Sequence, residues 1–299
     1  MKALDALTMQ LVWDRLLAIV EEQAQTLMRT AFSTVVREAG DLSAGVFDTN
    51  GAMLAQAITG TPGHVNAMAR SVSHFLNRYP LLSMKQGDVF LTNDPWLATG
   101  HLNDFTVVTP VFRRGQPIAL FASTSHIADV GGRGFGPDAN EVYEEGINIP
   151  IMALFNGGVR NETLLQIIAA NVRDPVVAEG DLYSLTACNE AGARDLESMM
   201  AAYELESLSE VANHVLATSR AAMMREINAL PAGIYENSID VDGYDEPVHI
   251  ACAMHVEKDR ILIDFAGSSP TSSYGINVPV NYTCLLYTSP SPRDGLLSR

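Results

Sequence analysis

The N-terminal part of the chain carries apolar residues at helical spacing. From Thr8 onward they recur every three or four positions, at Met9, Val12, Leu16, Ile19, Val20, Leu27 and Ala31. This period is typical of an amphipathic helix, and Thr8 can cap its first turn. The pattern predicts a long helix with one face on the core.

Three further segments have helical patterns. They are residues 66–79, which end before Pro80, residues 161–171, and a long stretch over residues 180–230 that Pro231 stops. The long stretch has one apolar stripe: Leu208, Val211, Val215, Ala222, Met223 and Ile227. Such a stripe is more typical of a core or a partner interface than of a cofactor-binding segment.

Strand patterns lie between these helices. Residues 45–55 have the form of a β-hairpin with its turn at Asp48–Gly51. Other β-rich segments are residues 87–92, 105–112, 118–124, 248–256 and 260–265. Helices and strands do not alternate regularly, and no solenoid repeat is visible. We therefore predict an α+β fold with mixed β-sheets and long packed helices.

Two copies of a short polar pattern provide the candidate chemistry. His101 and Asp104 form one His-x-x-Asp unit, and His126 and Asp129 form the other. Both sit at the edges of predicted strands, and Asp94 in the Asn-Asp-Pro turn is a further carboxylate. Imidazole and carboxylate groups are common ligands of divalent cations. The residues alone leave two interpretations open, a metal site or hydrogen-bonded turns.

A glycine-rich run, residues 130–137, follows the second unit. Glycine permits close backbone approach, so this run is either a loop over the metal or a mobile connection. A Walker A phosphate loop needs Gly-Lys-Ser/Thr leading into a helix, and this run has neither the lysine nor a clear helix start.

Composition narrows the class of protein. The 299 residues are 47% hydrophobic, which fits one large or two modest globular domains. The net charge of −16, with 19 scattered Lys and Arg residues, argues against a nucleic-acid partner. Three widely spaced cysteines make no disulfide framework. With neither a signal peptide nor a membrane-length apolar run recognised, we expect a cytoplasmic protein without a membrane partner.

At this point a set of ordered motifs resembles a known family. The motifs are Arg29-Thr-Ala-Phe-Ser33, Asp41-Leu-Ser43, Asn93-Asp-Pro95, Gly100-His-Leu-Asn-Asp104, His126-Ile-Ala-Asp-Val-Gly-Gly132, Glu145-Gly-Ile-Asn-Ile-Pro150, Asn171-Val-Arg173 and Asp264-Phe-Ala-Gly-Ser-Ser-Pro270. Together they resemble the hydantoinase B family, which includes the matching part of 5-oxoprolinase and is related to the metal-bearing subunit of acetone and acetophenone carboxylases. The resemblance covers about residues 8–282.

The resemblance implies a subunit of an ATP-dependent enzyme. A hydantoinase A-type ATPase partner would phosphorylate the substrate, and this chain would complete the reaction at a divalent metal (Mn, Fe, Co or Zn) in a hetero-oligomer. His101, Asp104 and His126 match the metal ligands. Asp129 would be a fourth ligand or support the ligands, and Asp94 or Asp129 could orient an imidazole or take a proton.

His64 matches the Pro-x-His position of the family in Thr61-Pro-Gly-His64. The resemblance implies that it lines the active site, while a satisfied core histidine is the alternative.

The chain also departs from the family pattern. It reads Ala98-Thr-Gly-His-Leu-Asn-Asp104 where the family often reads Gly-Gly-Thr-His-Leu-Pro-Asp, so the substrate is not carried over. Family members usually continue for about as many residues again. We therefore expect residues 1–282 to be the N-terminal portion of the family domain, with a sub-boundary near 231. Residues 283–299 resemble translated sequencing-adapter sequence, or else form a Ser/Pro-rich tail.

Three functions follow from these observations. The first is a hydrolase subunit that opens hydantoin, N-methylhydantoin or 5-oxoproline-like rings; the second is a subunit of a ketone carboxylase; the third is a non-catalytic scaffold. Hydrolysis is favoured because it is the commonest assignment in the family.

Overall fold

A seven-stranded antiparallel sheet forms the centre of the molecule. The computed structural model describes residues 4–134 and 136–286. The strand order is β2-β1-β5-β4-β3-β6-β7. The strands are β1 (Leu42–Phe47), β2 (Met53–Gln56), β3 (Val89–Thr92), β4 (Asp104–Arg113), β5 (Gln116–His126), β6 (Met152–Asn156) and β7 (Val159–Arg160).

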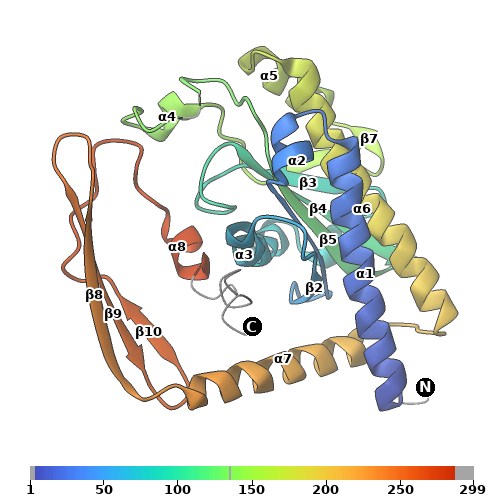
Figure 1. Cartoon of the computed structure of the whole chain (residues 1–299). Helices are drawn as coiled ribbons and strands as arrows, with labels where there is room; N and C mark the ends of the chain where they lie inside the picture. Colours follow the sequence, from blue (N-terminus) through green and yellow to red (C-terminus); the bar gives the residue numbers. More distant parts are fainter. Residues whose placement is uncertain (1–3, 135, 287–299) are drawn as a thin grey trace.

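Helices cover both faces of this sheet (Figure 1). The helices of the described residues are α1 (Ala6–Thr30), α2 (Thr34–Ala39), α3 (Pro62–Arg78), α4 (Val142–Glu145), α5 (Glu162–Asn171), α6 (Pro175–Ala202), α7 (Ser209–Ala229) and α8 (Val280–Leu286), with a 3₁₀ turn at Leu81–Ser83. The long helices α1 and α6 pack side by side on one face, and α3 packs on the other.

The alternation of side chains along β5 shows how the two cores form. Phe121 belongs to the apolar cluster that includes residues of α1 and α6. Its neighbours Leu120 and Ala122 belong to the cluster around Phe75 of α3. Successive side chains of a strand point to opposite faces, so this central strand is buried on both sides.

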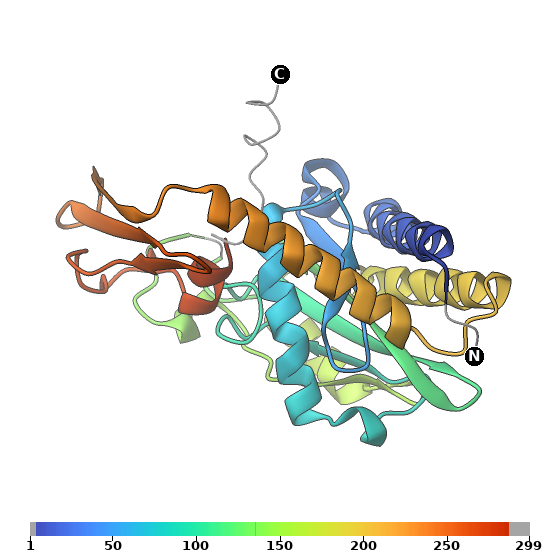
Figure 2. The ribbon, with the colours of Figure 1, turned by 90° about the horizontal axis from the view of Figure 1, so that it is seen from below.

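A smaller sheet stands apart from the main body (Figures 1 and 2). It has the order β10-β9-β8, from β8 (Gly233–Val241), β9 (Val248–Val256) and β10 (Ile261–Asp264). Helix α7 leads to it, and the chain then returns to α8, which contacts α3. The α7–β8 junction falls at the predicted sub-boundary near 231; the division into domains stays a prediction.

The α+β class is confirmed, but some predicted element boundaries are wrong. The first helix is capped by Asp5, whose Oδ1 accepts a hydrogen bond from Thr8 N at 2.7 Å. The predicted helix at 66–79 begins at Pro62, which places His64 in its first turn. The continuous helical stretch over 180–230 is two helices, broken at 203–208, where Glu204 has φ +54°.

The predicted apolar stripe of the last long helix is only partly buried. Leu208, Val211 and Val215 lie in the core, whereas Met223 is 54% exposed. Within the described residues, no helix is both long and apolar enough to cross a membrane. Most of the predicted tail at 283–299 lies outside the described residues, which end at residue 286 of α8.

Candidate metal centre

A row of polar residues lies at one end of three adjacent strands in the middle of the sheet. Asp104 is the first residue of β4 and pairs directly with His126, the last residue of β5. On the other side of β5, His126 N donates a hydrogen bond to the carbonyl oxygen of Asp41, the residue before β1. The order β1-β5-β4 therefore sets Asp41, His126 and Asp104 side by side.

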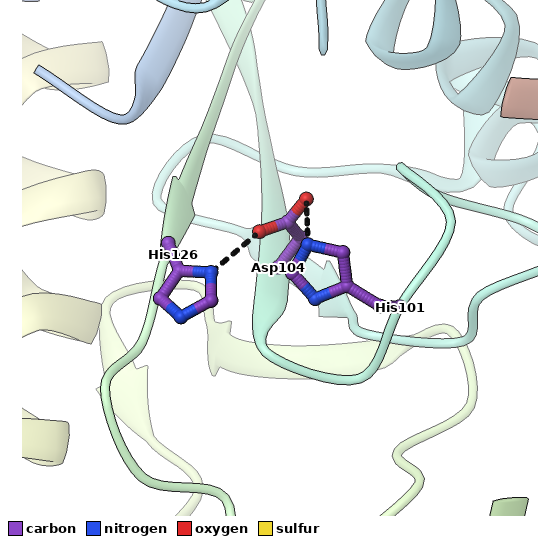
Figure 3. A group of neighbouring side chains, drawn as sticks. All are labelled: His101, Asp104 and His126. Carbon is purple, nitrogen blue, oxygen red and sulfur yellow. Dashed lines mark ion pairs between the residues drawn. The ribbon is translucent and has the colours of Figure 1, made fainter. Parts of the chain in front are cut away.

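His101 joins this row from the turn before β4 (Figure 3). Its Nε2 lies 3.2 Å from Asp104 Oδ2, and His126 Nδ1 lies 3.4 Å from Asp104 Oδ1. The two imidazole rings are 5.2 Å apart between centroids. One ligand atom from each of His101, Asp104 and His126 lies within 4.8 Å of the others, which is compact enough for a single cation.

Asp104 is the central residue of the cluster. Its side chain is fully buried, and Oδ2 accepts a hydrogen bond from the Thr99 hydroxyl at 2.8 Å. Burial alone would raise the pKa of this carboxyl group. The charge of His64 and the close approach of the three surrounding imidazoles outweigh it and hold the pKa well below its ordinary value. Asp104 is therefore kept as a carboxylate.

His64 reaches the same carboxylate from the first turn of α3. Its Nε2 lies 3.0 Å from Asp104 Oδ2 and 3.6 Å from Asp41 Oδ1. Burial lowers the pKa of His64, but the attraction of these two carboxylates exceeds that effect and raises it. The residue is thus buried, as a core histidine would be, and it also contacts the cluster.

Asp41 is a member of the site that spacing did not single out. Besides its place beside His64 and His126, its Oδ1 accepts a hydrogen bond from the Thr61 hydroxyl at 2.6 Å. Asp41 is far in sequence from both His-x-x-Asp units and has no histidine three positions away. The signal that could have found it is its place immediately before a strand, within the family-like Asp41-Leu-Ser43 motif.

Asp94 and Asp129, the other predicted carboxylates, lie outside the group. Asp94 Oδ1 accepts a hydrogen bond from Trp96 N at 2.9 Å and stabilises a turn. Asp129 accepts hydrogen bonds from the backbone and guanidinium N–H groups of Arg173, the latter at 2.8 Å. Among the described residues, the ligand group contains neither. The structure gives both aspartates local structural partners, and a catalytic role for either stays a prediction.

The glycine-rich run packs against neighbouring backbone. Gly131 and Gly132 have φ +83° and +57°, and a Cβ at either would clash with the carbonyl oxygen of Asn171 or Glu144. The Arg133 side chain pairs with Glu144, with Nε 3.3 Å from Oε2. These contacts hold the described part of the run against the α4 segment and the end of α5.

A pocket of about 500 Å³ opens beside His101. Its walls are the segments at 95–101, 139–145 and 274–279. A second pocket of about 260 Å³ adjoins it and is lined by Gly100, His101 and Tyr282. The Tyr282 side chain packs so closely on Gly100 that a Cβ there would lie 3.0 Å from the Tyr282 Cβ and 3.1 Å from its ring. Of the three candidate ligands, His101 is the one that lines both pockets.

The donor set fits a divalent cation. Two imidazoles and one carboxylate with room for further ligands are typical of catalytic Zn²⁺ and of related transition-metal sites. Asp104 Oδ1 is buried and makes no hydrogen bond of ordinary geometry. A buried carboxylate oxygen without such a partner is costly in a protein interior, and a cation between these side chains would satisfy it.

Comparisons with known proteins identify relatives of this chain. The sequence profile described as "Hydantoinase B/oxoprolinase" matches residues 5–289. The chain is 27% identical to caprolactamase subunit beta of Pseudomonas jessenii, over 80% of this chain and 41% of that protein. It is 26% identical to 5-oxoprolinase 1 of Arabidopsis thaliana, over 92% of this chain and 24% of that protein.

A solved structure shows the same fold. The crystal structure of ATP-dependent caprolactamase from Pseudomonas jessenii superposes with a TM-score of 0.86 at 24% identity, over 95% of this chain and 49% of that chain. The chain thus spans about half or less of the length of the relatives it matches. The profile covers nearly all of its residues, and the chain belongs to the hydantoinase B/oxoprolinase family.

Proposed function

We propose that this chain is the metal-dependent subunit of an ATP-dependent hydrolase of cyclic amides. The observation that carries the proposal is the group of His101, Asp104 and His126, with ligand atoms within 4.8 Å beside an open pocket. The names of the relatives, 5-oxoprolinase and caprolactamase, support ring opening of a lactam or hydantoin as the reaction class.

His101, Asp104 and His126 would hold the divalent metal, Mn, Fe, Co or Zn. When bound, such an ion polarises an amide oxygen and lowers the pKa of water. The surrounding residues position the ligands: Thr99 and His64 fix the Asp104 carboxylate, and Asp41 lies 3.8 Å from His126 Nδ1. His64 Nε2 lies between the carboxylates of Asp104 and Asp41, and their attraction raises the pKa of His64.

ATP would be used by a partner. The sequence has no Walker A phosphate loop, and the "subunit beta" in the name of the caprolactamase relative supports a two-subunit enzyme. We infer a hydantoinase A-type ATPase as that partner, in a hetero-oligomer that takes a small cyclic substrate.

The test is reconstitution with a hydantoinase A-type ATPase subunit. We expect ATP-dependent ring opening of a hydantoin or lactam by the pair, and loss of at least about 100-fold on Asp104→Asn. Asp240→Asn is the matched control, because Asp240 also pairs with a histidine, His249, at 2.7 Å but in the small sheet. Ring opening that survives Asp104→Asn, or that needs no ATPase partner, would contradict the proposal.

Two alternatives give different results in the same assay. A ketone carboxylase subunit would consume acetone or acetophenone with bicarbonate and leave cyclic amides intact. A scaffold would support partner activity without metal, unchanged by Asp104→Asn.

A further inference from the structure

The pocket beside His101 has a distinctive wall. Three aromatic side chains line it, and two of them are largely uncovered: Trp96 is 54% and Tyr143 is 83% exposed. The third, Tyr274, stacks on Tyr244 with 4.6 Å between ring centroids. Aromatic faces of this kind pack well against a small planar or puckered ring.

The charge of this wall is entirely negative. Its carboxylates are Glu141 and Glu145, and neither Lys nor Arg is among the residues that line it. Arg133, on the neighbouring loop, is paired with Glu144 instead. A divalent cation at the His101 end would be offset by the carboxylates of Asp41 and Asp104. Among the residues that line the wall, neither a lysine nor an arginine compensates the two glutamates, and Glu145 has only His101 as a charged neighbour.

We propose that this pocket selects neutral cyclic amides and rejects rings that carry a carboxylate. The inference rests on the proposed function, which supplies the reacting centre at His101, and it specifies the substrate class. Among rings suggested by the family, hydantoins and caprolactam are neutral, whereas 5-oxoproline carries a carboxylate at neutral pH. The wall offers that carboxylate no cationic side chain and places two like charges near it.

The size of the effect follows from Coulomb repulsion. A ligand carboxylate about 8 Å from a glutamate in a partly exposed site is repelled by it. This repulsion lowers the affinity for the ligand roughly three- to thirtyfold, depending on the effective dielectric constant. Salt screens this repulsion over about 10 Å at 0.1 M, so the discrimination is expected to be largest at low ionic strength.

The experiment compares two ligands that differ in charge and hardly in size. These are 5-oxoproline and its primary amide, 5-oxoprolinamide. Their binding to the Zn²⁺-loaded full chain is measured by NMR titration at pH 8 and low salt. We expect the amide to bind at least about threefold more tightly. The Glu141→Gln/Glu145→Gln double variant should reduce this preference, and Glu141→Gln alone should reduce it partly.

Glu226→Gln is the matched control, because it removes the same charge from an exposed position on α7 outside the pocket. It should leave the preference unchanged. Equal or tighter binding of 5-oxoproline, a preference unaffected by the glutamate substitutions, or a protein that binds neither ligand would overturn the inference. Zinc content, measured on the same samples, reports separately on the metal centre, so the inference can fail while the proposed function stands.

Discussion

At the scale of single residues, Asp104 organises the site. Side chains of His64, Thr99, His101 and His126 meet at its carboxylate, which is fully buried. Thr99 and His101 lie in the turn just before β4, whereas His64 and His126 are more distant in sequence. The carboxylate thus holds together a helix, a turn and two strands.

Asp41 provides the first prediction. Its carboxylate lies 3.8 Å from His126 Nδ1 and 3.6 Å from His64 Nε2. Groups that support metal ligands typically contribute 10- to 100-fold to metal affinity, and we expect about that loss on Asp41→Asn in a chelator competition. Asp94→Asn is the control, since it makes the same change outside the group. Equal affinities for the Asp41 and Asp94 variants would show that Asp41 does not support the site.

Asp129 provides a pH-dependent prediction. Burial raises the pKa of Asp129, but hydrogen bonds from Arg173 and Gly131 and the charge of Arg173 outweigh it and lower the pKa. A carboxylate whose pKa is lowered by folding contributes its full stabilisation above the pKa that it has in the unfolded chain, near 3.9. That stabilisation is lost as the pH falls through the lower pKa of the folded protein. Wild type should therefore lose more stability than Asp129→Asn between pH 6 and about pH 3.

Urea unfolding at several pH values measures this difference. Asp259→Asn, in the exposed turn between β9 and β10, is the control and should follow wild type. If Asp129→Asn also follows wild type through the acid range, the pair with Arg173 contributes nothing to folding.

The residue pattern pointed to the two His-x-x-Asp units, and the family resemblance implied His101, Asp104 and His126 as the ligands. The structure brings these three side chains together. Asp129 fits the same spacing, but Arg173, which is distant in sequence, takes its carboxylate. The spacing of residues along the chain cannot show that a distant residue such as Arg173 will pair with a candidate ligand. Nor can it show that strand pairing brings Asp41 to the cluster.

At the scale of elements, the packing of α6 on the sheet supports the strands that carry the site. Gly192 of α6 faces the buried ring of Phe121 on β5, and a Cβ there would lie 2.5 Å from the ring. Gly180 of the same helix faces Phe32 at the same distance, but Phe32 is 52% exposed and can move.

These glycines form a matched pair. Replacing a helical Gly by Ala stabilises the helix by about 1 kcal/mol, and this gain applies at both positions. The cost of overpacking a core, about 1–3 kcal/mol, applies only at Gly192, because the buried Phe121 ring cannot move away. We expect Gly192→Ala to be less stable than Gly180→Ala by about 1–3 kcal/mol in urea unfolding. Equal stabilities would mean that Phe121 moves as freely as Phe32.

The spacing of apolar residues predicted the long helices and the hairpin strands. It gave wrong predictions where buried and exposed positions do not follow the apolar period of a helix or strand. Apolar Leu205 and Leu208 continue the helical period through the break between α6 and α7, because both are buried in the turn. Strand β8 was missed because its polar residues interrupt the apolar alternation, and every position along it is exposed. Its strand state comes from pairing with β9.

At the scale of the whole molecule, the small sheet leaves an apolar face uncovered. The register places one set of side chains on the same face, and its exposed members are Tyr235, Ile239, Val241, Ile250 and Ile261. Ile239 and Ile250 are direct cross-strand partners, 59% and 39% exposed. A contiguous apolar surface of this kind differs from the scattered exposed residues of ordinary surfaces.

This face predicts strong binding of a hydrophobic dye. We expect Ile239→Thr/Ile250→Thr to reduce the fluorescence of bound anilinonaphthalene sulfonate, with little change in stability because threonine also favours strands. Ile58→Thr is the control, an exposed isoleucine at 93% away from this sheet, and it should leave the fluorescence unchanged. Unchanged fluorescence in the double variant would place the dye elsewhere.

We propose that His101, Asp104 and His126 together hold one divalent metal ion. The most direct measurement is the metal content of the folded chain after reconstitution with Mn, Fe, Co or Zn, determined by elemental analysis. We expect about one ion per chain in wild type and in His249→Ala, and little or none in His101→Ala and His126→Ala. A folded wild type that takes up no metal, or histidine variants that keep it, would contradict the account.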